Sequence, residues 1–127
     1  GIVVTIIKQD DDEATSVKIQ PDGKIVIAGF TYSGKEYDFL VARYNSDGSL
    51  DNSFGVNGKV VTSIGSDDDR AYALELQDDG KIVVVGYSAN GDSKGPINAM
   101  AIVRYTNSGK LDTQFGSNGK VRLNIGK

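Results

Sequence analysis

The feature that most constrains the fold of this chain is that its sequence repeats itself. Residues 1–29 align with residues 58–86 at an offset of 57, and 16 of the 29 aligned positions are identical. Farther along, the Arg-Tyr pair at 43–44 aligns with the pair at 104–105 at an offset of 61, so the second copy carries four extra residues in between. Repeats of this length are typical of supersecondary units that bury a shared face by stacking. We therefore expect two copies of one small structural unit.

Each copy reads as a series of β-strands. Apolar and polar residues alternate over residues 14–20, and a second apolar run at 24–32 begins after a Pro-Asp-Gly turn at 21–23. An Asp-Gly turn between two such runs favours an antiparallel hairpin. Residues 39–44 and 59–64 continue the pattern as a third and a fourth strand. Four antiparallel strands per copy, with no helical periodicity, predict one blade of a β-propeller.

These strands define the expected fold and its divisions. We expect an all-β fold, a β-propeller segment of two four-stranded antiparallel blades with one extra N-terminal strand at residues 2–7. The whole chain, 1–127, would form a single propeller segment. Its first copy covers 1–57, its second copy covers 58–118, and a terminal strand follows at 119–127.

Two blades do not close a ring, because known propellers have roughly four to eight. Unpaired blades would leave exposed the apolar faces that blades bury against one another. Two completions are open: homo-oligomerisation, for which we favour three chains, or the remaining blades of a longer chain. The sequence begins at Gly1 without a basic, signal-like segment, so either a targeting signal has been removed or the sequence is a piece of a longer one.

The composition argues against several classes of function. A net charge of −3 and an isoelectric point near 4.8 provide no basic field for a phosphate backbone, so we expect no nucleic-acid partner. The chain has no histidine and no cysteine, which removes the usual proton shuttle and the imidazole or thiolate metal sites. We therefore expect no catalytic residues and no cofactor, with a pair of carboxylates as the remaining route to an enzyme. No apolar run reaches the roughly 18 residues that a membrane span needs.

Two runs of three aspartates occupy equivalent positions before the first strand of each copy. Carboxylates on flexible loops suit Ca²⁺, which makes these six residues candidate calcium ligands. In the interpretation that we favour, one aspartate per run fixes a turn by accepting backbone N–H bonds and the others are solvated. A third interpretation is electrostatic attraction of a basic partner. The runs are Asp10, Asp11 and Asp12 in the first copy and Asp67, Asp68 and Asp69 in the second.

The loops after the second strand of each copy are expected on the same end of the blades as the acidic runs. Loops carried by a rigid scaffold are where binding residues concentrate. The second of these loops, at 88–98, holds the four-residue insertion, which reflects either tolerated length variation or diversified recognition. The candidate binding residues are Thr31, Tyr32, Lys35, Glu36 and Tyr37 in the first loop and Asn90, Asp92 and Lys94 in the second.

Two arginines end apolar strands, and a partly buried guanidinium needs a carboxylate partner. We expect Arg43 to pair with Asp12 or with Asp51 of its own copy. The equivalent set in the second copy is Arg104 with Asp69 or Asp112.

The remaining recurrent residues have structural interpretations. Lys24 and Lys81 follow turns and are expected in solvent, whereas Phe54 and Phe115 are expected to pack between blades. The segment NSDGSLD at 45–51 offers oxygen donors for calcium, but its counterpart in the second copy lacks two of them. We therefore interpret this segment as a turn.

The strings QPDGKIVIAG at 20–29 and DFLVARYNSDGSLDNSFGVNGKV at 38–60 resemble the delta-60 repeat, a bacterial repeat family assigned to β-propellers. The resemblance covers both copies. The second copy departs from it at Asp78 in place of proline, at Ala99 in place of the acidic residue seen as Asp38, and at 107–108. The resemblance implies a propeller and, because such repeats occur in large secreted or surface proteins of undefined function, an extracytoplasmic location. It implies no activity.

These observations together lead to an expected class of function. We expect a non-catalytic binding or scaffold module that recognises a protein or a glycan on its loop face. A structural spacer in a larger surface protein is the main alternative, and a carboxylate-based propeller enzyme is a third. No motif in the sequence identifies the ligand.

Overall fold

The computed structural model of the chain describes residues 1–5, 11–92 and 95–124, with the side chains of 92 and 95–97 left out. The described residues form strands and no helix, so none of them belongs to a helix long and apolar enough to cross a membrane. The predicted all-β class is confirmed. The strands are β1 (Asp12–Ile19), β2 (Ile25–Tyr32), β3 (Tyr37–Tyr44), β4 (Lys59–Thr62), β5 (Asp69–Leu76), β6 (Ile82–Asp92), β7 (Gly95–Tyr105) and β8 (Lys120–Leu123).

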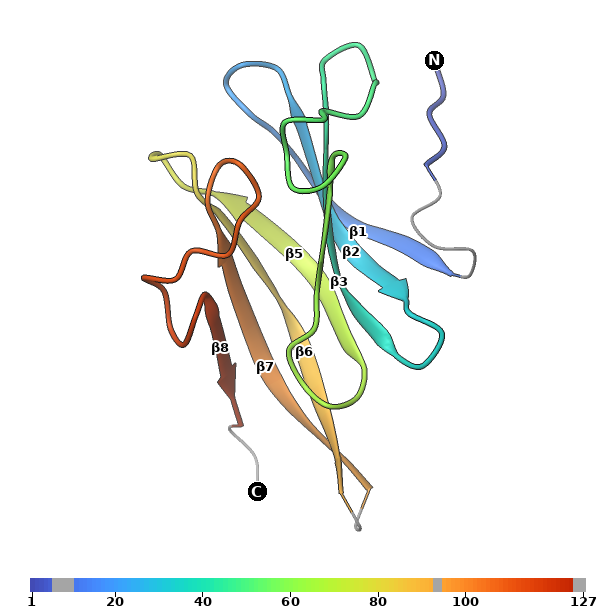
Figure 1. The fold of residues 1–127 in the computed structure, drawn as a ribbon, viewed down its shortest axis with the longest axis vertical. Coiled ribbons are helices and arrows are strands. Elements are labelled where there is room, and N and C mark those ends of the chain that lie inside the picture. Colours follow the sequence, from blue (N-terminus) through green and yellow to red (C-terminus); the bar gives the residue numbers. More distant parts are fainter. Residues whose placement is uncertain (6–10, 93–94, 125–127) are drawn as a thin grey trace.

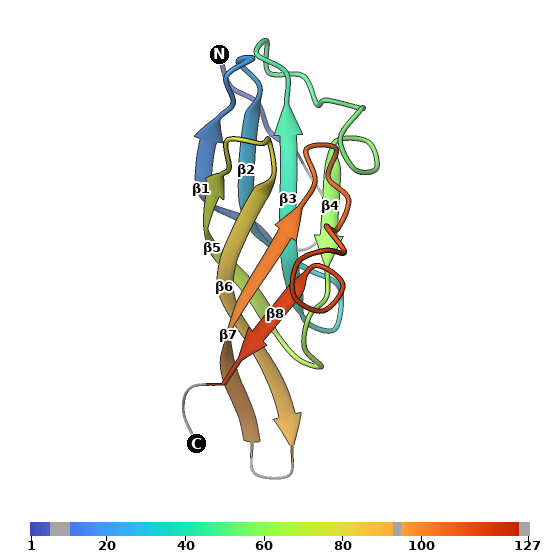
Figure 2. The ribbon, with the colours of Figure 1, turned by 90° about the vertical axis from the view of Figure 1, so that its left-hand side faces the viewer.

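The strands form two antiparallel sheets that stack as layers (Figures 1 and 2). The strands of the first sheet lie between residues 12 and 62 and those of the second between residues 69 and 123, so each sheet takes its fourth strand from beyond the end of its repeat copy. The strand order is β1-β2-β3-β4 in the first sheet and β5-β6-β7-β8 in the second, so the two predicted four-stranded blades are confirmed. The hydrophobic core lies between the sheets, and we call this contact the blade joint. Its buried members are Val26, Ala28, Phe39, Val41 and Phe54 from the first copy, and Ala71, Leu74, Ile82, Val84, Ala101, Val103 and Tyr105 from the second.

The blade joint uses opposite faces of two equivalent sheets. Val26 of the first sheet is buried in the joint, whereas its equivalent in the second copy, Val83, alternates with the joint residues of β6 and lies on the outer face. Conversely, Ile82 of the second sheet is buried in the joint, and its equivalent, Ile25, lies on the outer face of the first sheet. The blades therefore stack head to tail, and each has a second face outside this joint.

The register of β1 on β2 shifts at Thr15, and an equivalent bulge recurs in β5. Gly29 lies opposite the first bulge, where a Cβ atom would come within 1.9 Å of the Glu13 carbonyl oxygen, so the close approach requires glycine. The bulge turns the Thr15 hydroxyl toward the second sheet, where it donates to the Ala71 carbonyl oxygen at 2.9 Å. The regular alternation predicted over residues 14–20 is therefore wrong at this position.

The prediction of a loop over residues 88–98 is wrong at both ends of that range, because those residues continue the two strands of the β6–β7 hairpin. Ala89 pairs with Asn98 and Asn90 pairs with Ile97, which makes β6 and β7 longer than β2 and β3. An insertion with an even number of residues can lengthen both strands of a hairpin without turning their side chains to the opposite faces. The four extra residues are accommodated in this way.

The extra N-terminal strand predicted at residues 2–7 is wrong over the part that the structure describes. Residues 1–5 form no strand, and residues 6–7 lie outside the described residues. The edge of β3 on which such a strand would pair is occupied by β4. The segment lies instead on the side of the first sheet away from the second (Figure 1), where Thr5 Oγ1 accepts a hydrogen bond of 2.8 Å from the Tyr44 hydroxyl. The terminal strand of the second blade is present as β8.

Arg43 connects the two blades at the end of β3. Its Nε and Lys24 Nζ each donate to Asp51 Oδ2 at 2.8 Å, and its Nη1 donates to the Asn107 carbonyl oxygen of the second blade at 2.6 Å. The guanidinium also lies over the Phe54 ring, 4.7 Å from the ring centroid. Of the two partners expected for Arg43, the structure selects Asp51. The expectation that Lys24 stands in solvent is wrong, because the buried Asp51 carboxylate attracts a second cation.

The second copy repeats this arrangement at its outer face. Arg104 Nε and Lys81 Nζ lie 2.8 and 3.1 Å from Asp112 Oδ2, and the Arg104 guanidinium is 4.6 Å from the Phe115 ring centroid. Asp112 is therefore the partner of Arg104, and Lys81, like Lys24, is paired. The Arg104 side chain is 20% exposed where that of Arg43 is 6% exposed, because the second sheet has no further blade against this face.

The two phenylalanines provide a matched test of the blade joint. Phe54 is fully buried, whereas Phe115 is only partly buried. We expect Phe54→Ala to lower the free energy of unfolding by about 3 kcal/mol, and Phe115→Ala to lower it by about 1 kcal/mol. Urea unfolding at a concentration where the chain is monomeric would measure both. Equal losses for the two variants would contradict the assigned joint.

Asp51 provides a test by pH. Hydrogen bonds from Lys24, Ser53 and Arg43 hold the pKa of the Asp51 carboxyl well below its ordinary value of 3.8. Because the folded pKa is lower than the unfolded pKa, ionised Asp51 stabilises the fold above roughly pH 4, and this contribution is lost as the pH falls toward the folded pKa.

We therefore expect Asp51→Asn to lower the free energy of unfolding at neutral pH by about 2 kcal/mol. The difference from the wild type should shrink as the pH falls below about 4, because the carboxyl of the unfolded wild type then takes up a proton while that of the folded chain stays ionised. Urea unfolding over a pH series measures the difference. A difference that stays constant down to acidic pH would show that the Asp51 charge has no part in stability.

Candidate binding site

The acidic runs and the loops after the second strands meet at one end of the blades, which we call the loop end. The Tyr32 amide donates to the Asp11 carbonyl oxygen at 2.9 Å in the first blade, and the Ala89 amide donates to the Asp68 carbonyl oxygen at 2.8 Å in the second. The Tyr37 amide crosses between blades and donates to Asp68 Oδ1 at 3.0 Å. The structure thus brings together most of the segments that the sequence placed at one face.

A cluster of aromatic rings surrounds one arginine at the loop end. Arg70 of the second blade lies over the rings of Tyr37 and Phe30 of the first, 4.3 and 5.0 Å from their centroids. Its Nη2 lies 3.6 Å from Asp68 Oδ2. Aromatic contacts with centroids 5.1 to 6.0 Å apart connect the remaining rings to these. The aromatic cluster consists of Phe30, Tyr32, Tyr37, Tyr72 and Tyr87 around Arg70.

Sequence reasoning missed Arg70, Tyr72 and Tyr87 as members of this site. Arg70 replaces the Glu13 of the first copy and Tyr72 replaces Thr15, so the only available signal was a change of chemical type between aligned positions. That signal did not indicate that side chains from β5 would lie against rings of the first blade. The head-to-tail stacking decides this contact.

The aspartates at the loop end have separate protein partners. Asp11 Oδ2 accepts from the Tyr37 hydroxyl at 3.2 Å, and Asp12 accepts from the Thr31 hydroxyl. Asp69 is fully buried and accepts from the amides of Ile64 and Gly65, as the turn-fixing interpretation predicts for one aspartate per run. Asp67 Oδ1 accepts from the amide of Asp68. Among the described residues, three or more acidic side chains do not gather as metal ligands would.

The other predicted binding residues divide between buried and accessible positions. Thr31 is fully buried, whereas Lys35 is exposed and Tyr32, Glu36 and Tyr37 are partly buried. Asn90 Oδ1 accepts from the Ser66 amide at 2.7 Å, which joins the β6–β7 hairpin to the segment before β5. Two predicted site residues, Asp10 and Lys94, lie outside the described residues. For Asp92 the structure describes the backbone and not the side chain.

Two tyrosines of the cluster, Tyr37 and Tyr87, remain neutral phenols at physiological pH. Burial raises the pKa of Tyr37, and the hydrogen bond to Asp11 raises it further. Burial likewise raises the pKa of Tyr87, although the nearby Arg70 opposes this change. The rings therefore present hydroxyl groups and apolar faces, which suit recognition better than proton transfer near neutral pH.

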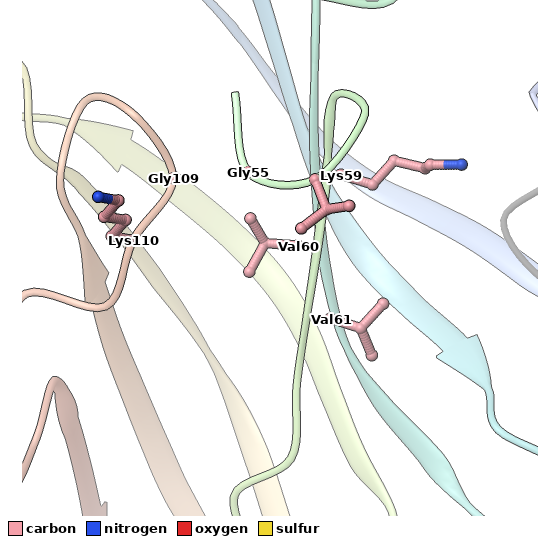
Figure 3. A pocket seen from close by; sticks show the side chains of 7 residues that line it. Gly55, Lys59, Val60, Val61, Gly109 and Lys110 are labelled. Atoms are coloured by element: carbon pink, nitrogen blue, oxygen red, sulfur yellow. The ribbon is translucent and has the colours of Figure 1, made fainter. Parts of the chain in front are cut away.

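A concave site lies at the opposite end of the blades and offers few side chains that could take part in chemistry. It is a hollow of about 480 Å³ between residues 55–61 of the first blade and the turn at Gly109 and Lys110 of the second (Figure 3). The charged side chains that line it in the described part of the chain are Lys59 and Lys110, and Figure 3 shows Lys59 pointing away from Lys110. Among the described residues, no carboxylate that could act as a general base lines it. The aromatic cluster is therefore the better candidate site.

Comparison with known proteins supports the fold. A family model described as "Domain of unknown function (DUF5122) beta-propeller" matches residues 20–54 and 77–115, more than half of the chain. Each matched segment runs from the end of a blade's first strand to the phenylalanine beneath its arginine. No curated protein and no solved structure matches the chain.

Arg70 provides a test of the cluster. We expect Arg70→Ala to lower the free energy of unfolding by about 1 kcal/mol, because the guanidinium stacks on two rings. The chain contains no tryptophan, so its intrinsic emission comes from tyrosine and should change in this variant. Lys35→Ala removes the same charge from an exposed position and serves as the control, with an expected change within about 0.5 kcal/mol. Equal stability and unchanged emission in both variants would contradict the stacking.

Proposed function

Because this chain belongs to the DUF5122 β-propeller family, whose description assigns an architecture and no activity, we propose its function from the loop end: it is a non-catalytic module that binds a protein with a basic surface. The observation that carries the proposal is the aromatic cluster around Arg70. Its residues come from both blades, so the surface has a defined shape on a rigid scaffold.

The residue types of the cluster support a protein partner. Tyrosine and arginine are over-represented among the residues that contribute most to binding energy in protein interfaces. Tyr72 is 49% exposed and stacks on Tyr87 with ring planes 22° apart, so its position is set before a partner arrives. A pre-positioned side chain loses little conformational freedom on binding.

The charge around the cluster supports a basic partner. Asp11 and Glu13 are exposed beside it, and Asp67 and Asp68 are partly buried. A surface with an excess of carboxylates attracts cations over roughly a Debye length and raises association rates at low salt. The third interpretation of the acidic runs, steering of a basic partner, therefore agrees best with the surface around the cluster. Calcium at these aspartates remains a secondary proposal, tested by adding Ca²⁺ to the binding assay.

Two further parts of the sequence interpretation are retained as proposals. The narrower assignment to the delta-60 repeat rests on the matching strings in both copies, and the extracytoplasmic location rests on that assignment. A structural spacer is the alternative to a binding module, and it differs by having no partner at the loop end.

Selection from a random peptide library would test the proposed function. We expect the immobilised wild-type chain to enrich basic peptides, and binding of a selected peptide to weaken at high salt. Tyr72→Ala should weaken that binding about thirtyfold, as for a central interface tyrosine. Val56→Ala is the matched control, because Val56 is exposed at the opposite end of the blade and its loss should leave binding unchanged.

The other outcomes are distinct. No enrichment over an empty surface would favour the spacer, whereas selected peptides that bind Tyr72→Ala and the wild type equally would place recognition elsewhere. A glycan array run in parallel tests a carbohydrate ligand. If the chain binds a glycan but no peptide, and Tyr72→Ala weakens the glycan binding, the partner is a carbohydrate and not a protein.

A further inference from the structure

The two outer faces of this chain are the equivalents of the two faces that form the blade joint. We propose that a second copy of the chain docks head to tail on the first, so that the outer face of its second sheet covers the outer face of the first sheet. The residues of the first outer face are Val17, Ile19, Ile25, Ile27 and Leu40. Those of the second are Val83, Val85, Met100 and Ile102, together with Tyr87. Tyr87 also belongs to the aromatic cluster, so a docked copy and a basic partner would compete for this part of the surface.

Exposure of equivalent residues supports this docking. Val17 on the first outer face is 57% exposed, whereas its equivalent in the blade joint, Leu74, is 3% exposed. On the second outer face Met100 is 49% exposed, whereas its equivalent in the joint, Phe39, is fully buried. These two sheet positions are thus apolar in both copies, and each is covered where another blade lies against it and exposed where none does. Exposed sheet faces of this kind mark interaction surfaces.

Charge also favours a second copy in this orientation. Lys18 Nζ and Glu75 Oε1 lie 2.8 Å apart across the blade joint, and they occupy the same position in the two repeat copies. Head-to-tail docking therefore sets Glu75 of one chain against Lys18 of the next, again as opposite charges.

The polar network of the joint can be repeated as well. Arg43 donates to the carbonyl oxygen of Asn107, and the residue equivalent to Asn107 in the first copy is Ser46. A docked chain would bring its Ser46 carbonyl oxygen to Arg104, whose guanidinium is already oriented by Asp112. Because a backbone carbonyl is present whatever the residue, the change from asparagine to serine does not remove this acceptor.

The N-terminal segment defines how this second joint is completed. Thr5 bonds the Tyr44 hydroxyl at 2.8 Å, and the equivalent pair in the blade joint, Thr62 of β4 and the Tyr105 hydroxyl, lies 2.6 Å apart. Residues 3–5 and 60–62 share the sequence Val-Val-Thr. The segment therefore occupies, on the first outer face, the place that the fourth strand of a preceding blade would take.

This placement makes the segment a competitor of β8 in the docked chain. The residue of β8 at the threonine position is Leu123, which has no hydroxyl to meet Tyr44. The proposal therefore includes a strand exchange: residues 2–5 of one chain pair with β7 of the next in place of β8. Because pairing in an antiparallel ladder uses backbone groups, the register of β8 on β7 predicts that Val4 would lie opposite Ala101, where Arg122 lies now.

The mass of the chain in solution tests the docking. We expect light scattering after size-exclusion chromatography to give a mass of two or more chains, and Val17→Asp to reduce it to one chain with an unchanged circular dichroism spectrum, since Val17 is exposed in the single chain. Val56→Asp, at an exposed apolar position outside both outer faces, should keep the larger mass. A single-chain mass for the wild type at every soluble concentration would overturn the proposal and leave further blades of a longer protein as the cover.

Cysteine variants test the strand exchange, because the chain has no native cysteine. A mixture of the single variants Val4→Cys and Ala101→Cys, treated with a short thiol cross-linker, should give a covalent dimer. In the double variant Ala101→Cys/Arg122→Cys, a cross-link within one chain forms only where β8 stays paired with β7, so its yield measures how much of β8 is retained. A dimer in the first experiment supports the exchange, whereas an assembled protein with no dimer and complete internal cross-linking would overturn it.

Discussion

The packing of one sheet face against the opposite face of its repeat is the constraint on which the rest of the structure depends. Each sheet carries apolar side chains on both faces, because its central strands are nearly continuous apolar runs. Burial of this area is the main favourable contribution that two blades can make to each other's stability. The blade joint also brings Arg43 to a carbonyl of the second blade, so the polar network and the apolar core form together.

The loop end depends on the same packing. Arg70 belongs to the second blade and stacks on rings of the first, and Tyr37 of the first blade bonds an aspartate of the second. Neither blade alone contains the aromatic cluster. In repeat proteins generally, the loops at such a joint can differ in sequence while the packing between neighbouring repeats stays the same.

Much of the fold and part of the candidate site could be predicted from the sequence. The turns and the strands of the two blades follow from local patterns, and Asp51 was one of two expected partners of Arg43. The errors have a common cause. The N-terminal segment resembles β4 yet forms no strand, because β4 already occupies the edge of β3. Lys24 was expected in solvent, but its ammonium group pairs with the Asp51 carboxylate. That carboxylate comes close to Lys24 only after β3 and the turn that follows it have folded back.

By itself the sequence determined the repeat, the strand period and the turn chemistry, because these depend on residues close together in the chain. The tertiary structure decided which face of each sheet is buried, which carboxylate each cation meets, and which side chains surround Arg70. Strands that are apolar on both sides carry no periodic signal that distinguishes one face from the other. The first sheet's joint face and its outer face therefore look alike in the sequence, and only the stacking of the second blade makes them different.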